Sequence, residues 1–396
     1  MKIIMLSPFS PYPPDSGGRI RQWELIRYLG CRHDLTLVFF INRGEEKMLD
    51  GVFKGICSRV EMITHSGDTT PSGTQQLPWP MRAYGVEPMR NMLRNLSSNR
   101  FDLLIIDFIY MAQHRAIFDA PAVLHEHNIE SSIFRQYSEL PNVHETEIAG
   151  VRKDALFWKA SWMLMRQYEN RTWPEFDLRV TVSRLDQEDM DSRCPHGRTL
   201  VAENGVNTGE IRMLPISRSK NVLFVGTMNY FPNIDGALFM AQSIMPCIWR
   251  IDPGIRLCIA GKNMPRRILD LGADPRIDII NNPPDIRSVA ADCSVSVVPL
   301  RLGGGTRIKI LEAFALGLPV VSTAKGCEGL IVEDGQHLLI RDDPESFAAA
   351  VAAAVNDPDL SESLRMNGRR LAEERYDWQK IFESTEKSML KLAMQV

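Results

Sequence analysis

The sequence lacks the features of a disulfide-stapled or membrane-spanning protein. Its 7 cysteines are an odd number and form no Cys-x-x-Cys pair, which favours reduced thiols in a cytoplasm. No apolar run reaches the ~18 residues that a transmembrane helix needs. The opening run Ile3–Leu6 is too short for a signal peptide, and Pro8 and Pro11 interrupt the chain directly after it. We therefore expect a cytoplasmic protein that begins with a buried strand.

Charge of one sign and the common nucleotide motifs are also missing. Lys and Arg number 46 and Asp and Glu number 49, so the net charge is -3 and a nucleic-acid carrier is not expected. No G-x-x-x-x-G-K-[ST] loop occurs, which argues against a P-loop ATPase. No G-x-G-x-x-G follows the first predicted strand, so a standard dinucleotide site is absent. No group of His, Cys and carboxylates has the spacing of a metal site.

Short apolar runs alternate with helical patterns, which predicts an α/β fold with parallel sheets. Strands are expected at Ile3–Leu6, Leu35–Phe40, Leu103–Ile106, Ala122–Leu124 and Leu178–Val182, and again at Val222–Val225, Arg256–Ala260, Ile277–Ile280, Ser294–Val298 and Pro319–Ser322. Helices are expected at Gly18–Leu29, Glu87–Leu96, Asn233–Ile248 and Thr306–Leu316. The pattern restarts after residue 215, so the chain is predicted to form two doubly wound domains.

The predicted domains are residues 1–208 and 209–375, joined near the polar stretch 207–219. Residues 376–396 are predicted to form a last helix that crosses back to the first domain. The turn formers of residues 64–80 predict a long loop, and loops of that length often carry function.

The most informative segment runs from Val298 to Gly317, where a strand ends, three glycines follow and a helix opens. Gly303, Gly304 and Gly305 let backbone N–H groups approach a ligand, Thr306 is a candidate N-cap, and Gly317 is a natural helix stop. Arg307 and Lys309 stand in the expected first turn, where a cation opposes the helix dipole by roughly 0.3–1 kcal/mol. An anion bound there would reverse the sign. Two exposed, hydrated cations are the alternative.

Glu312 lies in the same predicted helix beside an apolar stripe. A carboxylate in that position needs a partner if it is buried. It could accept two hydrogen bonds from a ribose diol. The alternative is a surface glutamate that pairs with Lys309 or Arg307.

Two strand ends stand out in the first half of the chain. Gly17 and Gly18 lie between the first strand and a helix, where an anion or an oxygen-rich ligand is favoured, although a tight turn is the simpler explanation. His125 and His127 follow another strand at the edge where ligands of open α/β sheets bind. Either histidine could donate to a ligand hydroxyl, or both could be structural. With Glu126 they alternate along an extended chain and cannot all face one metal ion.

With these motifs the sequence resembles the retaining glycosyltransferases of family 4 over nearly its whole length. The matching segments include Gly17-Gly18, His125 and His127, Val182-Ser183-Arg184, Glu203-Asn204-Gly205-Val206, Phe224-Val225-Gly226, Ile259-Ala260-Gly261, the stretch from Glu312 to Val321, and Tyr376-Asp377-Trp378. The stretch around Glu312 is the most specific. The resemblance implies the GT-B fold, two Rossmann-like domains facing across a cleft.

The resemblance also implies the roles of the domains. The second would bind a nucleotide-sugar donor, with Glu312 on the ribose, the backbone after Gly303 on the diphosphate and sugar, and Gly226 beside the donor. The first would hold the acceptor, and the loop of His125 and His127 would contact sugar hydroxyls. The family binds its donor without a metal, so the resemblance implies neither a metal nor a cofactor.

Two departures from the family pattern bear on the donor site. Gly304 stands where the family commonly has a glutamate that contacts the sugar. The loop Gly226–Asn233 carries no cation, although the family often has an Arg and a Lys there. Arg307 and Lys309 are the natural substitutes for binding the diphosphate.

The function expected from the resemblance is metal-independent, retaining sugar transfer from a UDP-sugar, or a GDP-sugar, to an acceptor hydroxyl in glycan biosynthesis. The acceptor would be a saccharide, a lipid-linked saccharide or a small molecule. A nucleotide-sugar epimerase and a non-catalytic nucleotide- or glycan-binding relative are the alternatives. The aromatic, Met-rich run Ala155–Arg166 is either a core helix or a peripheral contact with the inner face of a membrane.

Overall fold

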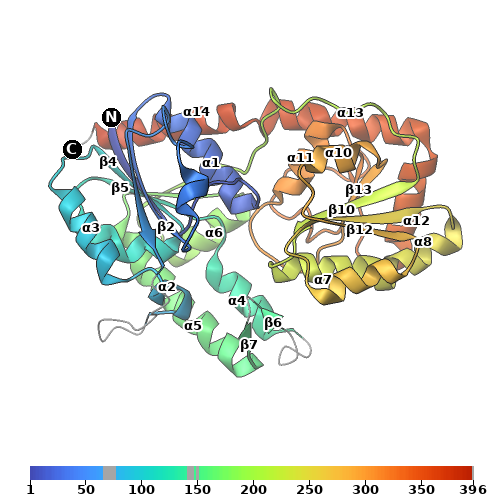
Figure 1. Cartoon of the computed structure of the whole chain (residues 1–396), viewed down its shortest axis with the longest axis horizontal. Helices are drawn as coiled ribbons and strands as arrows, with labels where there is room; N and C mark the ends of the chain where they lie inside the picture. Colours follow the sequence, from blue (N-terminus) through green and yellow to red (C-terminus); the bar gives the residue numbers. More distant parts are fainter. Residues whose placement is uncertain (66–76, 141–146, 149–150, 395–396) are drawn as a thin grey trace. The chain divides into compact units, whose positions relative to one another are not determined.

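The computed structural model describes residues 1–65, 77–140, 147–148 and 151–394. The predicted loop at 64–80 lies mostly outside them. The chain divides into two compact units (Figure 1). Unit 1 contains residues 1–140, 154–203 and 381–396, and unit 2 contains residues 141–153 and 204–380. The division after Glu203 falls slightly before the predicted boundary at 208.

Unit 1 is built on a seven-stranded parallel sheet with the order β3-β2-β1-β4-β5-β8-β9. Its strands are β1 (Lys2–Ser7), β2 (Asp34–Ile41), β3 (Arg59–Thr64), β4 (Leu103–Asp107), β5 (Ala122–His125), β8 (Leu178–Thr181) and β9 (Arg198–Val201). The inner strands are the predicted apolar runs, because helices cover both faces of a parallel sheet. The two edge strands β3 and β9 were not predicted, because their residues are mostly half-buried or exposed.

Most helices of unit 1 connect these strands. They are α1 (Gly17–Gly30), α2 (Trp79–Arg82), α3 (Glu87–Ser97), α4 (Glu130–Ser138), α5 (Ala155–Thr172) and α6 (Arg184–Arg193), with 3-10 turns η1 (Glu46–Leu49), η2 (Ile109–Ile117) and η4 (Trp173–Glu175). The last helix, α14 (Trp378–Ala393), runs beside α1 (Figure 1). There the Tyr28 hydroxyl donates to Glu386 at 2.9 Å, and its ring packs against Phe382.

Helix α5 contains the aromatic, Met-rich run. One face is core, since Trp158, Met165 and Tyr168 are buried and the Trp158 ring meets that of Tyr137 in α4. The other face exposes Leu156 and Met163. Among the described residues, no helix has both the length and the hydropathy to cross a membrane.

Unit 2 has a six-stranded parallel sheet with the order β12-β11-β10-β13-β14-β15. Its strands are β10 (Asn221–Thr227), β11 (Arg256–Lys262), β12 (Ile277–Asn281), β13 (Val295–Val298), β14 (Val320–Ser322) and β15 (Leu339–Ile340). The short strands β6 (Glu147–Ile148) and β7 (Val151–Arg152) form a separate antiparallel pair. The first five strands of the sheet correspond to the predicted runs, and only the two-residue edge strand β15 was not predicted.

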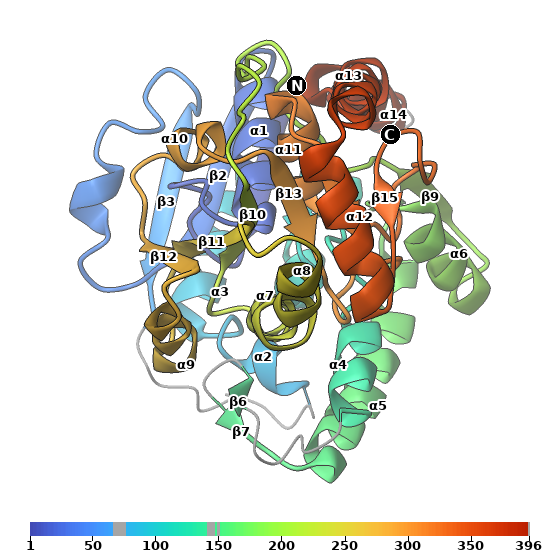
Figure 2. The same ribbon diagram turned by 90° about the vertical axis from the view of Figure 1, so that its right-hand side faces the viewer.

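The helices of unit 2 cover both faces of its sheet. They are α7 (Phe231–Phe239), α8 (Met245–Ile251), α9 (Arg266–Leu269), α10 (Ile286–Ala291), α11 (Ile308–Leu316), α12 (Pro344–Asn356) and α13 (Pro358–Arg375), with a 3-10 turn η6 (Asp270–Ala273). Figure 2 shows α10 and α11 on one side of the sheet and α7 and α8 on the other. The helix predicted at Asn233–Ile248 is interrupted, because a π-helical turn η5 (Met240–Ile244) separates α7 from α8.

Candidate functional site

In unit 2, the loop between β13 and α11 turns on two glycines with left-handed backbone. Gly303 has φ 118° and Gly305 has φ 62°, a region that residues with a Cβ rarely adopt. The helix begins at Ile308 and its N-cap is Arg307. The prediction of Thr306 as the N-cap is therefore wrong. Its Oγ1 is buried and bonds to nothing described, while its carbonyl accepts from Asn204 at 3.2 Å.

The guanidinium of Arg307 folds back onto this loop instead of extending into solvent. It donates to the carbonyl oxygens of Gly304 and Gly305, and to that of Lys325 at 3.5 Å. Arg307 is only 8% exposed, and within the described ranges it forms no ion pair with a carboxylate. This is a buried cation whose charge is not neutralised, so hydrated, exposed cations do not describe the site. An anion would compensate it.

The backbone of the same loop offers donors to such an anion. The N–H groups of Gly304 and Gly305 make no hydrogen bond to any residue that the structure describes. They precede the N-terminus of α11, where the helix dipole also favours negative charge.

Lys309 is the second cation, and its Nζ is buried against β10 and α7. It donates to the carbonyl of Val225 at 2.6 Å and to Oδ1 of Asn233 at 2.7 Å. Burial and the charge of Arg307 lower the pKa of Lys309 to about 7, against the attraction of Glu312. A neighbouring anion would restore its full charge.

Glu312 follows one helical turn later and is half-buried. Its carboxylate makes no hydrogen bond and no ion pair within the part of the chain described, so the alternative of pairing with Lys309 or Arg307 is wrong. Burial raises the pKa of Glu312 to about 7, although Lys309 opposes the rise. Unused carboxylate oxygens in such a place suit a ligand with hydroxyl donors.

Gly226 has a packing reason for being glycine. A Cβ on this residue would lie 2.8 Å from Cγ of Asn233. The side chain of Asn233 is the one that accepts the hydrogen bond from Lys309. Asn233 is itself fixed by donating to the carbonyl of Thr227 at 2.9 Å. Gly226 thereby brings α7 close enough to β10 for Asn233 to reach Lys309.

Unit 2 matches a known family. Residues 219–357 fit the model of the family described as Glycosyl transferases group 1. This match covers most of unit 2. A relative from Klebsiella pneumoniae, an "uncharacterized 44.6 kDa protein in cps region", is 24% identical over 97% of this chain and 98% of its own.

Solved structures confirm the predicted fold for the whole chain. Alr3699/HepE of Anabaena, solved with UDP-glucose, has a TM-score of 0.69 at 16% identity, with 99% of this chain and 100% of that chain covered. Sucrose-phosphate synthase of Thermosynechococcus elongatus has a TM-score of 0.71 at 16% identity, with both chains covered completely. Each sheet, together with the helices that cover it, is one of the two doubly wound, Rossmann-like domains of the GT-B fold.

Asn233 is a partner of Lys309 that the sequence did not reveal. Arg307, Lys309 and Glu312 were found because charges beside an apolar helix break a local pattern. An asparagine near a helix start breaks none, and only the structure brings it to Lys309, 76 residues away in sequence.

In unit 1, the predicted histidines lie at and just after the carboxyl end of β5, and the predicted glycines open α1, the helix that follows β1. The ring of His127 hydrogen-bonds through Nε2 to Oδ1 of Asp107 at 2.9 Å. His125 is 1% exposed, neither of its ring nitrogens has a hydrogen-bond partner among the described residues, and burial lowers its pKa to about 3. Its Nδ1 lies 3.9 Å from Oδ1 of Asp107. His125 is therefore an interior side chain, and of the two histidines only His127 reaches the surface.

The two glycines of unit 1 lie where α1 begins. Gly17 is its first residue, after the N-cap Ser16. Gly18 lies against Phe108, since a Cβ would come to 3.0 Å from Cζ of that ring. Gly18 therefore lets α1 approach the end of β4 closely. This packing role goes beyond the simple tight turn that was the alternative explanation.

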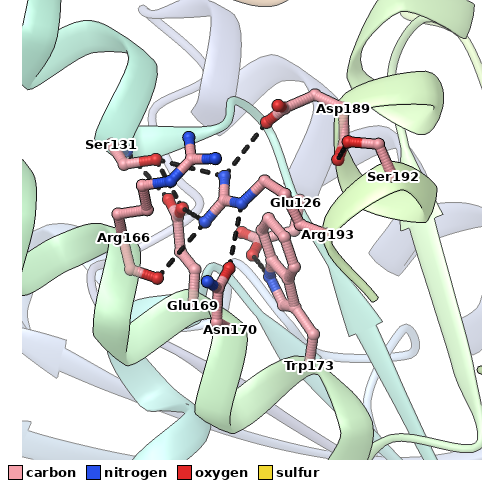
Figure 3. A network of polar contacts seen from close by, with 9 residues as sticks. All are labelled: Glu126, Ser131, Arg166, Glu169, Asn170, Trp173, Asp189, Ser192 and Arg193. Carbon is pink, nitrogen blue, oxygen red and sulfur yellow. Dashed lines mark hydrogen bonds and ion pairs between the residues drawn. The ribbon is translucent and has the colours of Figure 1, made fainter. Parts of the chain in front are cut away.

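Glu126, between the two histidines in sequence, belongs to the network of Figure 3. It accepts a hydrogen bond from Nε1 of Trp173 at 2.8 Å, and the guanidinium of Arg193 lies 4.3 Å from the Trp173 ring centroid. Arg193 in turn pairs with Glu169 at 2.5 Å. The histidine loop is therefore anchored through its middle residue. No trio of His, Cys, Asp or Glu in the described ranges could hold a metal ion.

Proposed function

We propose that this protein transfers a sugar from a nucleoside-diphosphate sugar to an acceptor hydroxyl. The observation that carries the proposal is the buried guanidinium of Arg307, which has no described carboxylate and lies beside the free N–H groups of Gly304 and Gly305. A diphosphate would supply the negative charge that Arg307 lacks nearby and the acceptor oxygens that the two N–H groups lack. A UDP-sugar is the donor we favour, because the similar Alr3699/HepE was solved with UDP and with UDP-glucose.

Each donor-site residue then has a chemical role. The charge that develops on the leaving diphosphate would be stabilised by Arg307, Lys309 and the loop amides. These groups would make a metal ion unnecessary. Glu312 would accept from the ribose hydroxyls, and Gly304, which lacks a side chain, would leave the sugar to backbone amides.

Retention is the stereochemistry we propose. The bond between the anomeric carbon and the leaving phosphate oxygen breaks, and the acceptor oxygen bonds to the same face of the sugar. The acceptor proton passes to the departing phosphate oxygen, so the products are a glycoside and the nucleoside diphosphate. This route needs no carboxylate nucleophile, and none is marked in the sequence.

The test is calorimetric titration with UDP, GDP, ADP and dTDP, with and without EDTA. We expect micromolar binding of one nucleotide, unchanged by EDTA and lost in Arg307→Ala and Glu312→Ala. Arg301→Ala is the matched control, because Arg301 lies in the same loop but is exposed and paired with Asp235. Absence of binding by all four nucleotides would contradict the donor site.

Turnover then separates the three candidate functions. Incubation of the sugar donor of the nucleotide that binds with a panel of saccharide acceptors, followed by proton NMR, should show nucleoside diphosphate and a glycoside with the donor's anomeric configuration. An epimerised nucleotide sugar without release would identify an epimerase. Binding without any reaction, with a panel of saccharide acceptors present, would identify a non-catalytic relative.

A further inference from the structure

Two consecutive residues at the end of β4 hold the imidazole of His127 from different sides. Asp107 meets the edge of the ring, with Oδ1 2.9 Å from Nε2. Its other oxygen accepts from Nε2 of Gln22, which also donates to Oγ of Ser7 at 2.9 Å. Asp107 is 1% exposed, so both of its oxygens are fixed by neighbours in the interior.

Phe108 holds the face of the same ring. Its phenyl ring is stacked on His127 with a centroid separation of 3.7 Å and an interplanar angle of 7°. Phe108 has φ 65° and ψ 137°, a backbone conformation that costs a residue with a Cβ about 1–3 kcal/mol and that gathers at functional sites. Gly18, having no Cβ, leaves room for this ring.

The position of the proton follows from the partners of Asp107. Gln22 donates an N–H to one oxygen of Asp107, and Nε2 of His127 faces the other, an arrangement that suits an ionised carboxylate. An ionised carboxylate only accepts hydrogen bonds, so the proton between Asp107 and His127 is on Nε2. The second ring nitrogen, Nδ1, has no described partner, and it lies 3.8 Å from the place that a Cβ on Gly18 would occupy.

We propose that Asp107 is a positioning residue that holds His127 as the Nε2–H tautomer, so that Nδ1 accepts a hydrogen bond from a substrate hydroxyl. This inference rests on the proposed function for the substrate, but its tautomer does not. It reverses the direction expected from sequence, in which the histidine donates. Phe108 keeps the ring plane fixed, so the lone pair of Nδ1 points toward the glycine turn that opens α1.

The tautomer is measured on the wild-type protein by 15N NMR of the imidazole nitrogens, with His127→Gln identifying the resonances. In the neutral imidazole we expect a protonated Nε2 and an unprotonated Nδ1. A neutral imidazole with its proton on Nδ1 would overturn the proposal without any assay of transfer.

The role of Asp107 is tested with Asp107→Asn, and Asp102→Asn is the control because Asp102 is exposed at the opposite end of β4. If Gln22 keeps donating to the amide oxygen, the NH2 group faces His127 and forces Nε2 to accept. We expect an inverted tautomer and a kcat about 10- to 100-fold lower, with little change in KM. In a His127→Ala background, Asp107→Asn should lower kcat no further.

The outcomes separate this inference from the proposed function. If no nucleotide sugar reacts, sugar transfer is refuted, and the 15N spectra still decide the tautomer. If Asp107→Asn inverts the tautomer but transfers sugar at the wild-type rate, the positioning role is refuted while transfer stands. An Asp107→Asn protein that does not fold leaves the wild-type spectrum to decide.

Discussion

The ammonium group of Lys309 donates a 2.7 Å hydrogen bond to Oδ1 of Asn233. The second acceptor of Lys309 is also uncharged, a backbone carbonyl. Lys309 is thus oriented toward neutral oxygens, and its pKa falls to about 7. Glu312, one turn away, has a pKa raised to about 7. Near pH 7 both Lys309 and Glu312 are therefore partly charged. A ligand that favours the charged form of either group would shift the pKa of that group, so binding of the proposed donor should depend on pH.

We predict that binding of UDP-glucose exchanges protons with solvent and that the exchange changes sign near pH 7. At pH 8.5 Lys309 is mostly neutral in the free protein, and a diphosphate that raises its pKa makes it take up a proton. At pH 6 Glu312 is mostly protonated, and ribose hydroxyls that favour its carboxylate make it release one. Affinity should therefore be greatest near pH 7 and fall on both sides.

Calorimetry in two buffers of different ionisation enthalpy measures this exchange. Lys309→Met should remove the uptake at pH 8.5 and leave the release at pH 6, and Glu312→Gln should do the reverse. Proton exchange that is unaffected by either substitution would assign it to other groups and contradict the two pKa shifts.

A second prediction concerns the glycine loop. A Cβ on Gly303 would lie 3.0 Å from Nη2 of Arg307, at φ 118°. Gly303→Ala should therefore displace the guanidinium and raise the Kd for the nucleotide about tenfold, or ~1.4 kcal/mol. Gly304 has no left-handed φ in this structure, so Gly304→Ala is the matched control and should bind almost normally. Equal losses in both variants would show that the loop does not act through Arg307.

The inner strands of both sheets were predictable, because residues buried on both faces of a parallel sheet form continuous apolar runs. Edge strands such as Arg59–Thr64 were not, since one side faces solvent and the run is broken by polar residues. The π-helical turn at Met240–Ile244 leaves no signal in an apolar helical pattern.

The site was predictable wherever a residue violated a local rule. Arg307 and Lys309 drew attention as cations at a helix start, but the sequence does not reveal that Arg307 folds onto its own loop. Asp107 was missed because a carboxylate at a strand end resembles an ordinary exposed residue. Asp107 is 20 residues from His127 in sequence, and only the fold brings the two side chains into contact.

A third prediction tests the ion pair between Arg193 and Glu169 in Figure 3. Glu169 also accepts from the backbone N–H and the hydroxyl of Ser131, so loss of Arg193 leaves a buried carboxylate without its countercharge. Arg193→Met should lower the free energy of unfolding by about 3–5 kcal/mol in urea denaturation.

Two comparisons check that assignment to the pair. Adding Glu169→Gln to Arg193→Met should recover much of the loss, because the uncompensated charge is gone. Arg135→Met removes an exposed ion pair with Glu139 and should cost less than about 1 kcal/mol. A double variant no more stable than Arg193→Met would indicate lost packing against Trp173 instead.

The last prediction uses Glu126, whose burial raises its pKa well above the usual range, with the charges of Glu169 and Glu130 adding to the rise and the hydrogen bond from Trp173 opposing it. The folded protein therefore retains a proton that the unfolded chain releases above its own, lower pKa. This contribution to stability is fully present below the unfolded pKa and is lost progressively as the pH rises. Glu126→Gln, which can still accept from Trp173, should be more stable than the wild type by about 1 kcal/mol at pH 8 and gain less at pH 5. Thermal denaturation at both pH values measures the difference, with Glu139→Gln as the exposed control, and a gain that does not grow with pH would contradict the raised pKa.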